Sequence, residues 1–229
     1  MVRELCYMHV PKTAGISWVY GLVSRLGPFE VVRPHVNCYV YHLTQHPDLV
    51  LTVLGHERRV PGYVTLEEHL AATRHDCMAV AFVRNPFDRF VSAFHHLQRG
   101  GLGVLDEADA RMHLGRCGHD FGRFVRSALD HDVPAVCSQI HFRPQIDWLI
   151  DRRRHRLLID FLGRYETIDS DTRQLATIIG FEPGALPHMN ATQHPPSAEL
   201  YDEETAALVA RIYQRDFDAF GYDPRHCHR

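Results

Sequence analysis

The fold of this chain is decided by the stretch Leu5-Cys6-Tyr7-Met8-His9-Val10-Pro11-Lys12-Thr13-Ala14-Gly15-Ile16-Ser17, in which an apolar run breaks into small and hydroxyl-bearing residues. Residues 5–10 predict a buried strand, and the helical spacing of apolar residues between 14 and 26 predicts a helix after it. The turn between them holds Lys12, the only lysine among 25 lysines and arginines. Small residues before a helix expose backbone N–H groups where the helix dipole favours anions, and lysine adds a compact charge. We therefore predict a phosphate- or sulfate-binding turn; a surface lysine in an ordinary loop is the alternative.

The rest of the chain alternates apolar strand-like runs with helical patterns. Further strands are predicted at residues 29–32, 49–54, 77–83 and 157–162. Further helices are predicted at residues 65–74, where a capping-box pattern opens the segment, and at 87–97, 121–129, 171–179 and 198 or 202 to 220. The Gly-rich residues 100–118 are expected to form a mobile loop. Because the apolar runs are buried on both faces, we predict an α/β fold with a mostly parallel sheet flanked by helices.

Composition limits the class of protein. A length of 229 residues favours one domain over 1–229, and a net charge of −3 argues against a general nucleic-acid binder. No apolar run approaches the roughly 18 residues of a membrane span. The sequence enters a strand at once, with no room for a signal peptide. The six cysteines form no CxxC pair and predict neither a disulfide framework nor a zinc site. We therefore expect a cytoplasmic protein without integral membrane contact; its oligomeric state is not predicted.

A second polar segment follows the apolar run 77–83. It reads Arg84-Asn85-Pro86-Phe87-Asp88-Arg89-Phe90-Val91-Ser92 and opens a helix. If the two strands are neighbours, both turns face one crevice at the carboxyl ends of the strands. Arg84 is then able to bind a phosphate through its guanidinium fork, and Ser92 to donate a hydroxyl hydrogen bond. The first turn is not a Walker A motif, since Lys12 precedes Thr-Ala-Gly, and no apolar run ends in an obvious Mg²⁺-binding acid. An ATPase is disfavoured.

Taken together, these two segments resemble the nucleotide motifs of PAPS-dependent sulfotransferases, where PAPS is 3′-phosphoadenosine 5′-phosphosulfate. The resemblance is to the carbohydrate branch, which includes heparan 2-O- and chondroitin sulfotransferases and their small bacterial relatives. It continues through residues 141–145, 160–166 and 216–222, and so covers nearly the whole chain in order. The resemblance implies a P-loop-like sulfotransferase fold, PAPS as donor, PAP as product and no metal.

The resemblance also implies roles for individual residues. Lys12 would act on the leaving group, and the residues that wrap the 5′-phosphosulfate would be Lys12, Thr13, Ala14, Gly15, Ile16 and Ser17. Arg84 and Ser92 would hold the 3′-phosphate. Asn190 and Thr192 lie where relatives close a loop over the nucleotide. Golgi relatives carry a membrane anchor and luminal disulfides, neither of which we expect here, so their secreted polymeric acceptors are not expected either.

Sulfuryl transfer needs a base that takes the proton of the acceptor hydroxyl, and histidine titrates nearest to neutral pH. The candidate is His56, which follows Gly55 directly after the predicted strand 49–54. A Gly-His pair at this place resembles the catalytic histidine of the carbohydrate branch. A surface loop histidine is the alternative interpretation. Glu57 and His141 are the other candidate bases; an unperturbed carboxylate, with a pKa of about 4.3, holds a proton too weakly.

The acceptor is expected to be a hydroxyl-bearing small molecule or a glycan. Arg58, Arg143 and His141 are candidate acceptor contacts, and with the run Arg152-Arg153-Arg154 they favour an anionic sugar or glycolipid. That run is otherwise a solvated turn, and tyrosines at 39, 41 and 63 are compatible with an apolar alcohol. Two other functions stay open: a Mg-dependent, kinase-like phosphotransferase and a non-catalytic PAP-binding protein.

Overall fold

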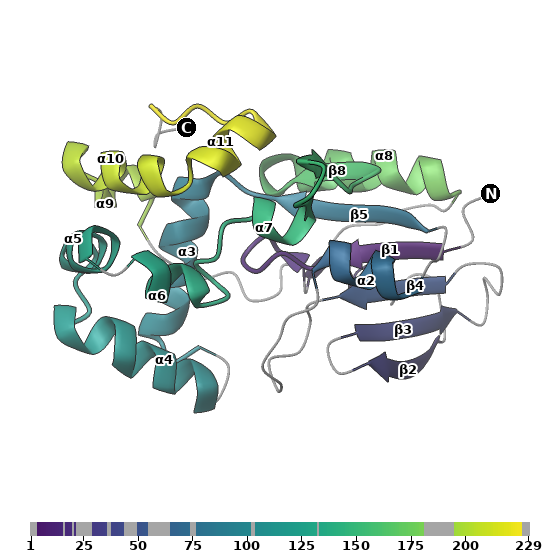
Figure 1. Cartoon of the computed structure of the whole chain (residues 1–229), viewed down its shortest axis with the longest axis horizontal. Helices are drawn as coiled ribbons and strands as arrows, with labels where there is room; N and C mark the ends of the chain where they lie inside the picture. Colours follow the sequence, from purple (N-terminus) through teal and green to yellow (C-terminus); the bar gives the residue numbers. More distant parts are fainter. Residues whose placement is uncertain are drawn as a thin grey trace. The chain divides into compact units, whose positions relative to one another are not determined.

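The computed structural model describes residues 4–15, 17–19, 21, 29–35, 38–43, 50–54, 65–73, 77–101, 104–131, 133–180 and 195–225. The chain divides into two compact units. The first consists of Met1–Val83 and Asp147–Asn190, and the second of Arg84–Ile146 and Ala191–Arg229. The first unit holds a β-sheet with helices on its faces, and the described part of the second is built of helices (Figure 1). A single domain over residues 1–229 stays a prediction.

The sheet of the first unit has six strands in the order β2-β3-β4-β1-β5-β8. Its parallel part consists of β4 (Val50–Leu54), β1 (Glu4–Met8), β5 (Met78–Val83) and β8 (Phe161–Arg164). The antiparallel strands β3 (Cys38–Leu43) and β2 (Phe29–His35) extend it beyond β4. The predicted α/β fold with a mostly parallel sheet is therefore confirmed. The strand β3 is an element that the sequence pattern did not predict.

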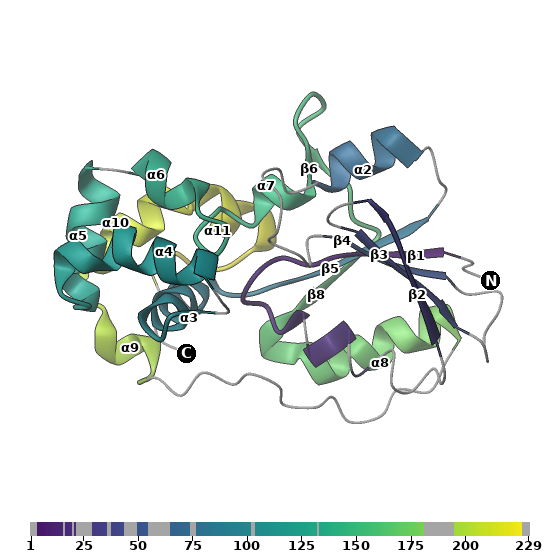
Figure 2. The same cartoon turned by 90° about the horizontal axis from the view of Figure 1, so that it is seen from below.

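Helices cover both faces of this sheet, which explains why its central strands are apolar throughout. Trp18 and Val19, from a helical segment that begins at Gly15, join one buried cluster with Leu175 and Ile179 of α8 (Ile168–Ile179) and the strand residues below them. Figure 2 shows α2 (Leu66–Thr73) on the opposite face. The predicted capping box opens α2, because the Thr65 amide donates to Glu68 Oε2 at 2.7 Å.

A short hairpin corrects the predicted strand 157–162. Its strands β6 (Ile150–Asp151) and β7 (Arg156–Leu157) follow α7 (Ile146–Leu149) and pair with each other outside the main sheet. The chain then rejoins the main sheet at Asp160, whose amide donates to the Ala79 carbonyl at 2.9 Å and whose carboxylate accepts from the Ala79 amide at 2.8 Å. Pairing with two different partners divides the apolar run into two strands. The turn η2 (Tyr165–Thr167) connects β8 to α8.

The second unit is a group of helices around an aromatic core. Its elements are α3 (Pro86–Gln98), α4 (Val104–Leu114), η1 (Gly115–Cys117), α5 (Phe121–His131), α6 (Val133–Ser138), α9 (Ser197–Leu200), α10 (Glu203–Ile212) and α11 (Gln214–Phe220). The ring of Phe90 lies 4.9 Å from that of Phe142, 5.8 Å from Phe124 and 5.9 Å from Tyr213, measured between centroids. Each such buried ring contributes about 1.5–3 kcal/mol. The helices predicted at 87–97 and 121–129 are confirmed.

Two predictions in this unit are wrong. Residues 100–118 were expected to form a loop, but α4 and η1 occupy most of them. Among its described side chains α4 buries only Ala110 and Leu114, which leaves too narrow an apolar stripe for a clear helical period. The helix predicted up to Phe220 is three helices, with a break at Tyr213 between α10 and α11. Among the helices of the described ranges, none combines the length and apolar character of a membrane span.

Candidate functional site

The turn after β1 has an unusual backbone. Lys12 and Ala14 adopt φ angles of 71° and 61°, while Thr13 between them does not have a positive φ. For a residue with a side chain the left-handed region costs roughly 1–2 kcal/mol, because Cβ approaches the following carbonyl oxygen. Two such residues within three positions strain the backbone, so contacts with the rest of the unit must hold them in this conformation. Strain of this kind concentrates at ligand-binding sites.

The local hydrogen bonds explain how the turn is held. Thr13 is buried, and its hydroxyl donates to the Val10 carbonyl at 2.9 Å. The Trp18 amide donates to the Ala14 carbonyl at 3.0 Å, which is the first bond of the following helix. Residues of alternating hand direct successive N–H groups into a concave anion-binding arrangement, and a helix start adds positive potential. Left-handed residues at a helix start are compatible with an anion-binding turn, and its binding of phosphate or sulfate stays a prediction.

Gly15 is required where this turn packs on β1. A Cβ at Gly15 would lie 2.1 Å from Cδ2 of His9 and 2.7 Å from the hydroxyl of Tyr7. The Tyr7 ring in turn stacks on Trp18, with 4.5 Å between centroids, and burial raises the pKa of Tyr7 well above its usual value. Only glycine allows this close approach, because a Cβ would overlap the side chains of His9 and Tyr7.

The structure therefore brings five predicted residues together in one turn of the first unit: Lys12, Thr13, Ala14, Gly15 and Ser17. Lys12 is partly exposed, whereas Ser17 is 6% exposed. β1 lies beside β5 and runs parallel to it, with Met8 opposite Ala81. The two strands that precede the predicted nucleotide-binding segments are thus neighbours that end at the same edge of the sheet, as the sequence-based hypothesis requires.

The segment after β5 begins the second unit and has an ordinary helix start. The side chain of Asn85 accepts a hydrogen bond from the Phe87 amide at 2.9 Å, and Pro86 occupies the first helical position. Both backbone groups of Arg84 are bonded to the side chain of Gln145, at 2.9 Å and 2.8 Å. Arg84 is partly buried. Unlike the turn after β1, this one has no left-handed residue.

Ser92 lies about two turns into α3, as predicted. It is 4% exposed. The assignment of Ser92 to a ligand stays a prediction.

The two predicted acceptor contacts in the second unit lie on the segment that leads to Gln145. The carbonyl of Arg143 accepts from Nη2 of Arg89 at 2.7 Å. His141 is 8% exposed, and its ring lies edge-on to that of His96 with 4.5 Å between centroids. Both residues therefore contribute to the packing of the unit, and their contact with an acceptor stays a prediction.

Several predicted site residues lie outside the described residues. These are Ile16, His56, Arg58, Asn190 and Thr192. Among the described residues, no group of three or more histidine, cysteine or acidic side chains is arranged to hold a metal ion.

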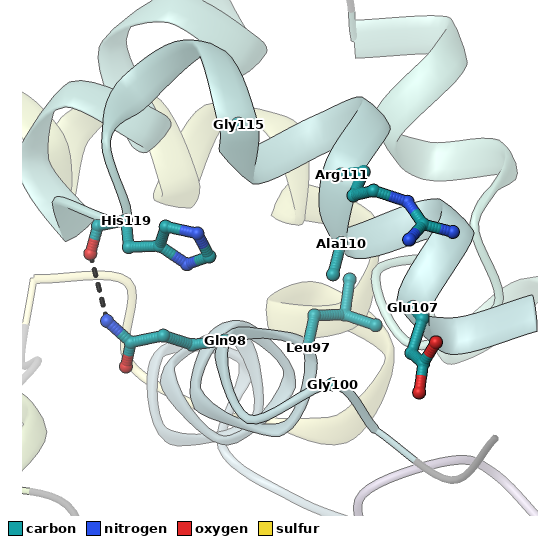
Figure 3. Close-up of a pocket in the computed structure, with 8 residues that line it drawn as sticks. All are labelled: Leu97, Gln98, Gly100, Glu107, Ala110, Arg111, Gly115 and His119. Carbon is teal, nitrogen blue, oxygen red and sulfur yellow. Dashed lines mark hydrogen bonds between the residues drawn. The ribbon is translucent and has the colours of Figure 1, made fainter. Parts of the chain in front are cut away.

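A hollow of about 320 Å³ lies in the second unit between the end of α3, α4 and η1 (Figure 3). It is lined by Leu97, Gln98, Gly100, Glu107, Ala110, Arg111, Gly115 and His119. Nε2 of Gln98 donates to the carbonyl of His119 at 2.9 Å. Of the predicted nucleotide-binding residues that the structure describes, none lines this hollow.

No curated protein and no solved structure was found to match the chain. The family model described as the sulfotransferase family matches residues 2–223. This match includes both segments on which the predicted nucleotide site depends, and it extends over nearly the whole sequence. The chain belongs to the sulfotransferase family.

Proposed function

We propose that this protein transfers the sulfuryl group of PAPS to a hydroxyl acceptor. The observation that carries the proposal is the turn after β1, where the only lysine of the chain lies in a strained, left-handed backbone at the start of a helix. Members of the family generally use PAPS as the sulfate donor. A backbone shaped for an anion, in a member of this family, is best explained by the phosphosulfate group of that donor.

In this proposal the two turns bind the two ends of PAPS. Residues 12–17, Ile16 included, wrap the 5′-phosphosulfate, while Arg84 and Ser92 bind the 3′-phosphate. Asn190 and Thr192 close over the nucleotide. Support comes from the adjacent, parallel β1 and β5, whose carboxyl ends lie at the same edge of the sheet.

The proposed reaction uses one base and one cation. His56 takes the proton of the acceptor hydroxyl as its oxygen forms a bond to sulfur, and the bond from sulfur to the bridging oxygen breaks. PAP leaves with the negative charge, which Lys12 and the N–H groups of its turn stabilise. Protons, electrons and charge balance without a metal ion, so we expect the reaction to proceed in EDTA.

The acceptor that we propose is a carbohydrate or glycolipid, as in the carbohydrate branch. Arg58, Arg143 and His141 are its proposed contacts. The exposed Arg152-Arg153-Arg154 turn of the β6–β7 hairpin adds positive charge for an anionic sugar. The Asp151 carboxylate accepts from the amides of residues 153 and 154 and thereby fixes this turn. We propose a cytoplasmic location; Cys6, Cys77, Cys117 and Cys137 form no disulfide in the structure.

The test is nucleotide selectivity measured by calorimetry. If Arg84 and Ser92 bind the 3′-phosphate, PAP binds far more tightly than AMP, and Arg84→Ala removes most of that preference. A charge-assisted contact of this kind contributes about 1.5–3 kcal/mol. Arg111→Ala, which removes an exposed arginine from α4, is the matched control and retains the preference. Equal affinity of the wild type for PAP and AMP would refute the assignment.

A transfer assay with labelled PAPS, with and without EDTA, separates the proposed reaction from its two rivals. Turnover of PAPS in EDTA supports sulfuryl transfer. Turnover only with ATP and Mg²⁺ indicates a phosphotransferase. PAP binding without turnover indicates a non-catalytic binding protein. In the same assay His56→Ala lowers turnover about 10²–10⁴-fold with PAP affinity unchanged. Near-normal turnover of this variant would show that the base lies elsewhere.

A further inference from the structure

The side chain of Gln145 bonds both backbone groups of Arg84. Its Oε1 accepts from the Arg84 amide at 2.9 Å, and its Nε2 donates to the Arg84 carbonyl at 2.8 Å. Gln145 is completely buried. Two hydrogen bonds from one rigid amide to one residue fix the peptide groups on both sides of its Cα. They therefore fix the direction in which the Arg84 side chain leaves the backbone.

Asp216 of α11 fixes Gln145 in turn. One oxygen of the Asp216 carboxylate accepts from the Gln145 amide at 2.8 Å, and the other accepts from the Ile146 amide at 2.9 Å. The carboxylate is completely buried. Burial raises the pKa of Asp216, and the nearby charge of Arg89 and the two amide donors oppose that increase. The carboxylate thus holds two consecutive backbone amides, so that the Gln145 side chain starts from a fixed point.

Arg89 connects the same network to α3. This arginine is 1% exposed, and its Nη2 donates to the carbonyl of Arg143, two residues before Gln145. Burial lowers the pKa of Arg89, and the nearby charge of Asp216 opposes that decrease. Asp216 and Arg89 therefore bring two buried, opposite charges to the short segment that ends in Gln145.

This arrangement is more than the start of α3 requires. Asn85 already accepts from the first free amide of the helix, and Pro86 sets its first turn. Buried charges are seldom the most stabilising way to fill a core, and where they persist they often select one arrangement of the chain. The network ends on the backbone of Arg84, the residue whose side chain is assigned to a phosphate. Its effect is to hold that side chain in one starting position.

We propose that Gln145 and Asp216 are positioning residues for recognition of the 3′-phosphate of PAPS, acting through the backbone of Arg84. This inference rests on the proposed function, because it assumes that Arg84 binds the 3′-phosphate. Neither residue touches the nucleotide in this proposal. A guanidinium whose starting position is fixed loses less entropy when it binds a phosphate.

The experiment compares PAP and AMP affinities in variants of the full chain. Gln145→Met keeps the size of the side chain and removes both bonds to Arg84. Because two buried hydrogen bonds are lost, PAP affinity is expected to fall by about tenfold. AMP lacks the 3′-phosphate, so its affinity is expected to stay within about twofold of the wild type. Gln145→Glu, which keeps the acceptor and loses the donor, gives an intermediate ratio and replaces Gln145→Met if that variant does not fold.

Tyr201→Phe is the matched control. The Tyr201 hydroxyl donates to the carbonyl of Phe87, also on α3, at 3.1 Å, and it is buried like the Gln145 side chain. This variant loses one hydrogen bond between a side chain and the backbone of the same unit, and it leaves the bonds of Arg84 unchanged. Thermal stability is expected to fall in both Gln145→Met and Tyr201→Phe. The ratio of PAP to AMP affinity is expected to fall only in Gln145→Met.

The outcomes separate this inference from the proposed function. If the wild type prefers PAP over AMP and Gln145→Met lowers stability but keeps that preference, only the positioning role is overturned. A wild type without preference for PAP would overturn both proposals. Asp216→Asn provides an independent reading, because its NH2 group cannot accept and one of the two amide bonds is lost; it is expected to lower the ratio by less than Gln145→Met.

Discussion

The turns after β1 and β5 follow neighbouring parallel strands and each opens a helix, yet they are built in opposite ways. After β1, Lys12 and Ala14 have left-handed backbones, and Gly15 packs without room for a Cβ. After β5, the helix has a conventional Asn85 cap and Pro86 at its first position. The first turn has left-handed residues, held in part by the bond from Thr13 to Val10, whereas the second is a conventional capped helix start.

The difference between the two turns matches the proposal that each binds a different end of the nucleotide. A turn that directs its own N–H groups at a ligand is suited to a group whose charge changes during reaction, because backbone dipoles stay in place as the charge develops. A turn whose first amide is already bonded to its cap offers side chains instead. These suit a phosphate that is recognised but does not react, the role proposed for Arg84 and Ser92.

The largest effect that the comparison predicts is at Lys12. Lys12→Ala is expected to lower turnover by about 10²–10³-fold, because a group that stabilises developing charge is removed. PAP lacks the sulfuryl group, so its affinity is expected to fall much less. Lys12→Arg is not expected to restore turnover, since a planar fork does not occupy the place of a point charge. Full turnover of the arginine variant in the labelled-PAPS assay would show that Lys12 is a general cation, and that the two turns differ less than their backbones do.

Gly15 provides a smaller, structural effect. The Cβ of Gly15→Ala would meet the His9 ring at 2.1 Å, so the unfolding free energy of the variant is expected to fall by about 1–3 kcal/mol. Its affinity for PAP is expected to be lost as well. Gly115→Ala is the matched control, because a Cβ there meets nothing within 4 Å, and a change within about 0.5 kcal/mol is expected. Urea unfolding of both variants gives the comparison. Equal stability would mean that the turn after β1 has room to move and is not held against Tyr7 and His9.

The sequence was sufficient to predict β1, β4 and β5 of the parallel part of the sheet, but not the bounds of β8. β1 and β5 are continuous apolar runs, and burial on both faces produces such runs directly. The break from residues 10 to 17 located the turn after β1, and the capping pattern located α2. These features depend on neighbouring residues, which is why periodicity and composition reveal them.

What the sequence did not reveal depends on distant contacts or on weak patterns. The left-handed φ of Lys12 and Ala14 is maintained by packing, and neither residue type favours it. The segments containing Gln145 and Asp216 were singled out by resemblance, but a bond across 71 positions has no local signature. The helix α4 was missed because its apolar stripe is narrow, although residues such as Ala108, Ala110 and Arg111 favour a helix.

The smallest effect tests whether the turn after β5 is an ordinary capped helix. Asn85→Ala is expected to lower the unfolding free energy by about 0.5–2 kcal/mol, because the Phe87 amide loses its partner. The cap of α10 is the control, since Asp202 accepts from the Thr205 amide at 2.8 Å in a capping box. That bond, with help from the Thr205 hydroxyl and Arg126, lowers the pKa of Asp202 to about 2.

The two caps should differ in their response to pH. A carboxyl whose pKa falls on folding stabilises the fold above its unfolded pKa of about 3.9, and this contribution is lost as the pH drops through the folded value. The difference between wild type and Asp202→Ala should therefore narrow between about pH 4 and pH 2, whereas the difference for the neutral Asn85 should stay constant. Urea unfolding across this pH range measures both. If Asn85→Ala has no effect at any pH, the turn after β5 does not depend on its cap, and the contrast with the turn after β1 rests on Gln145 alone.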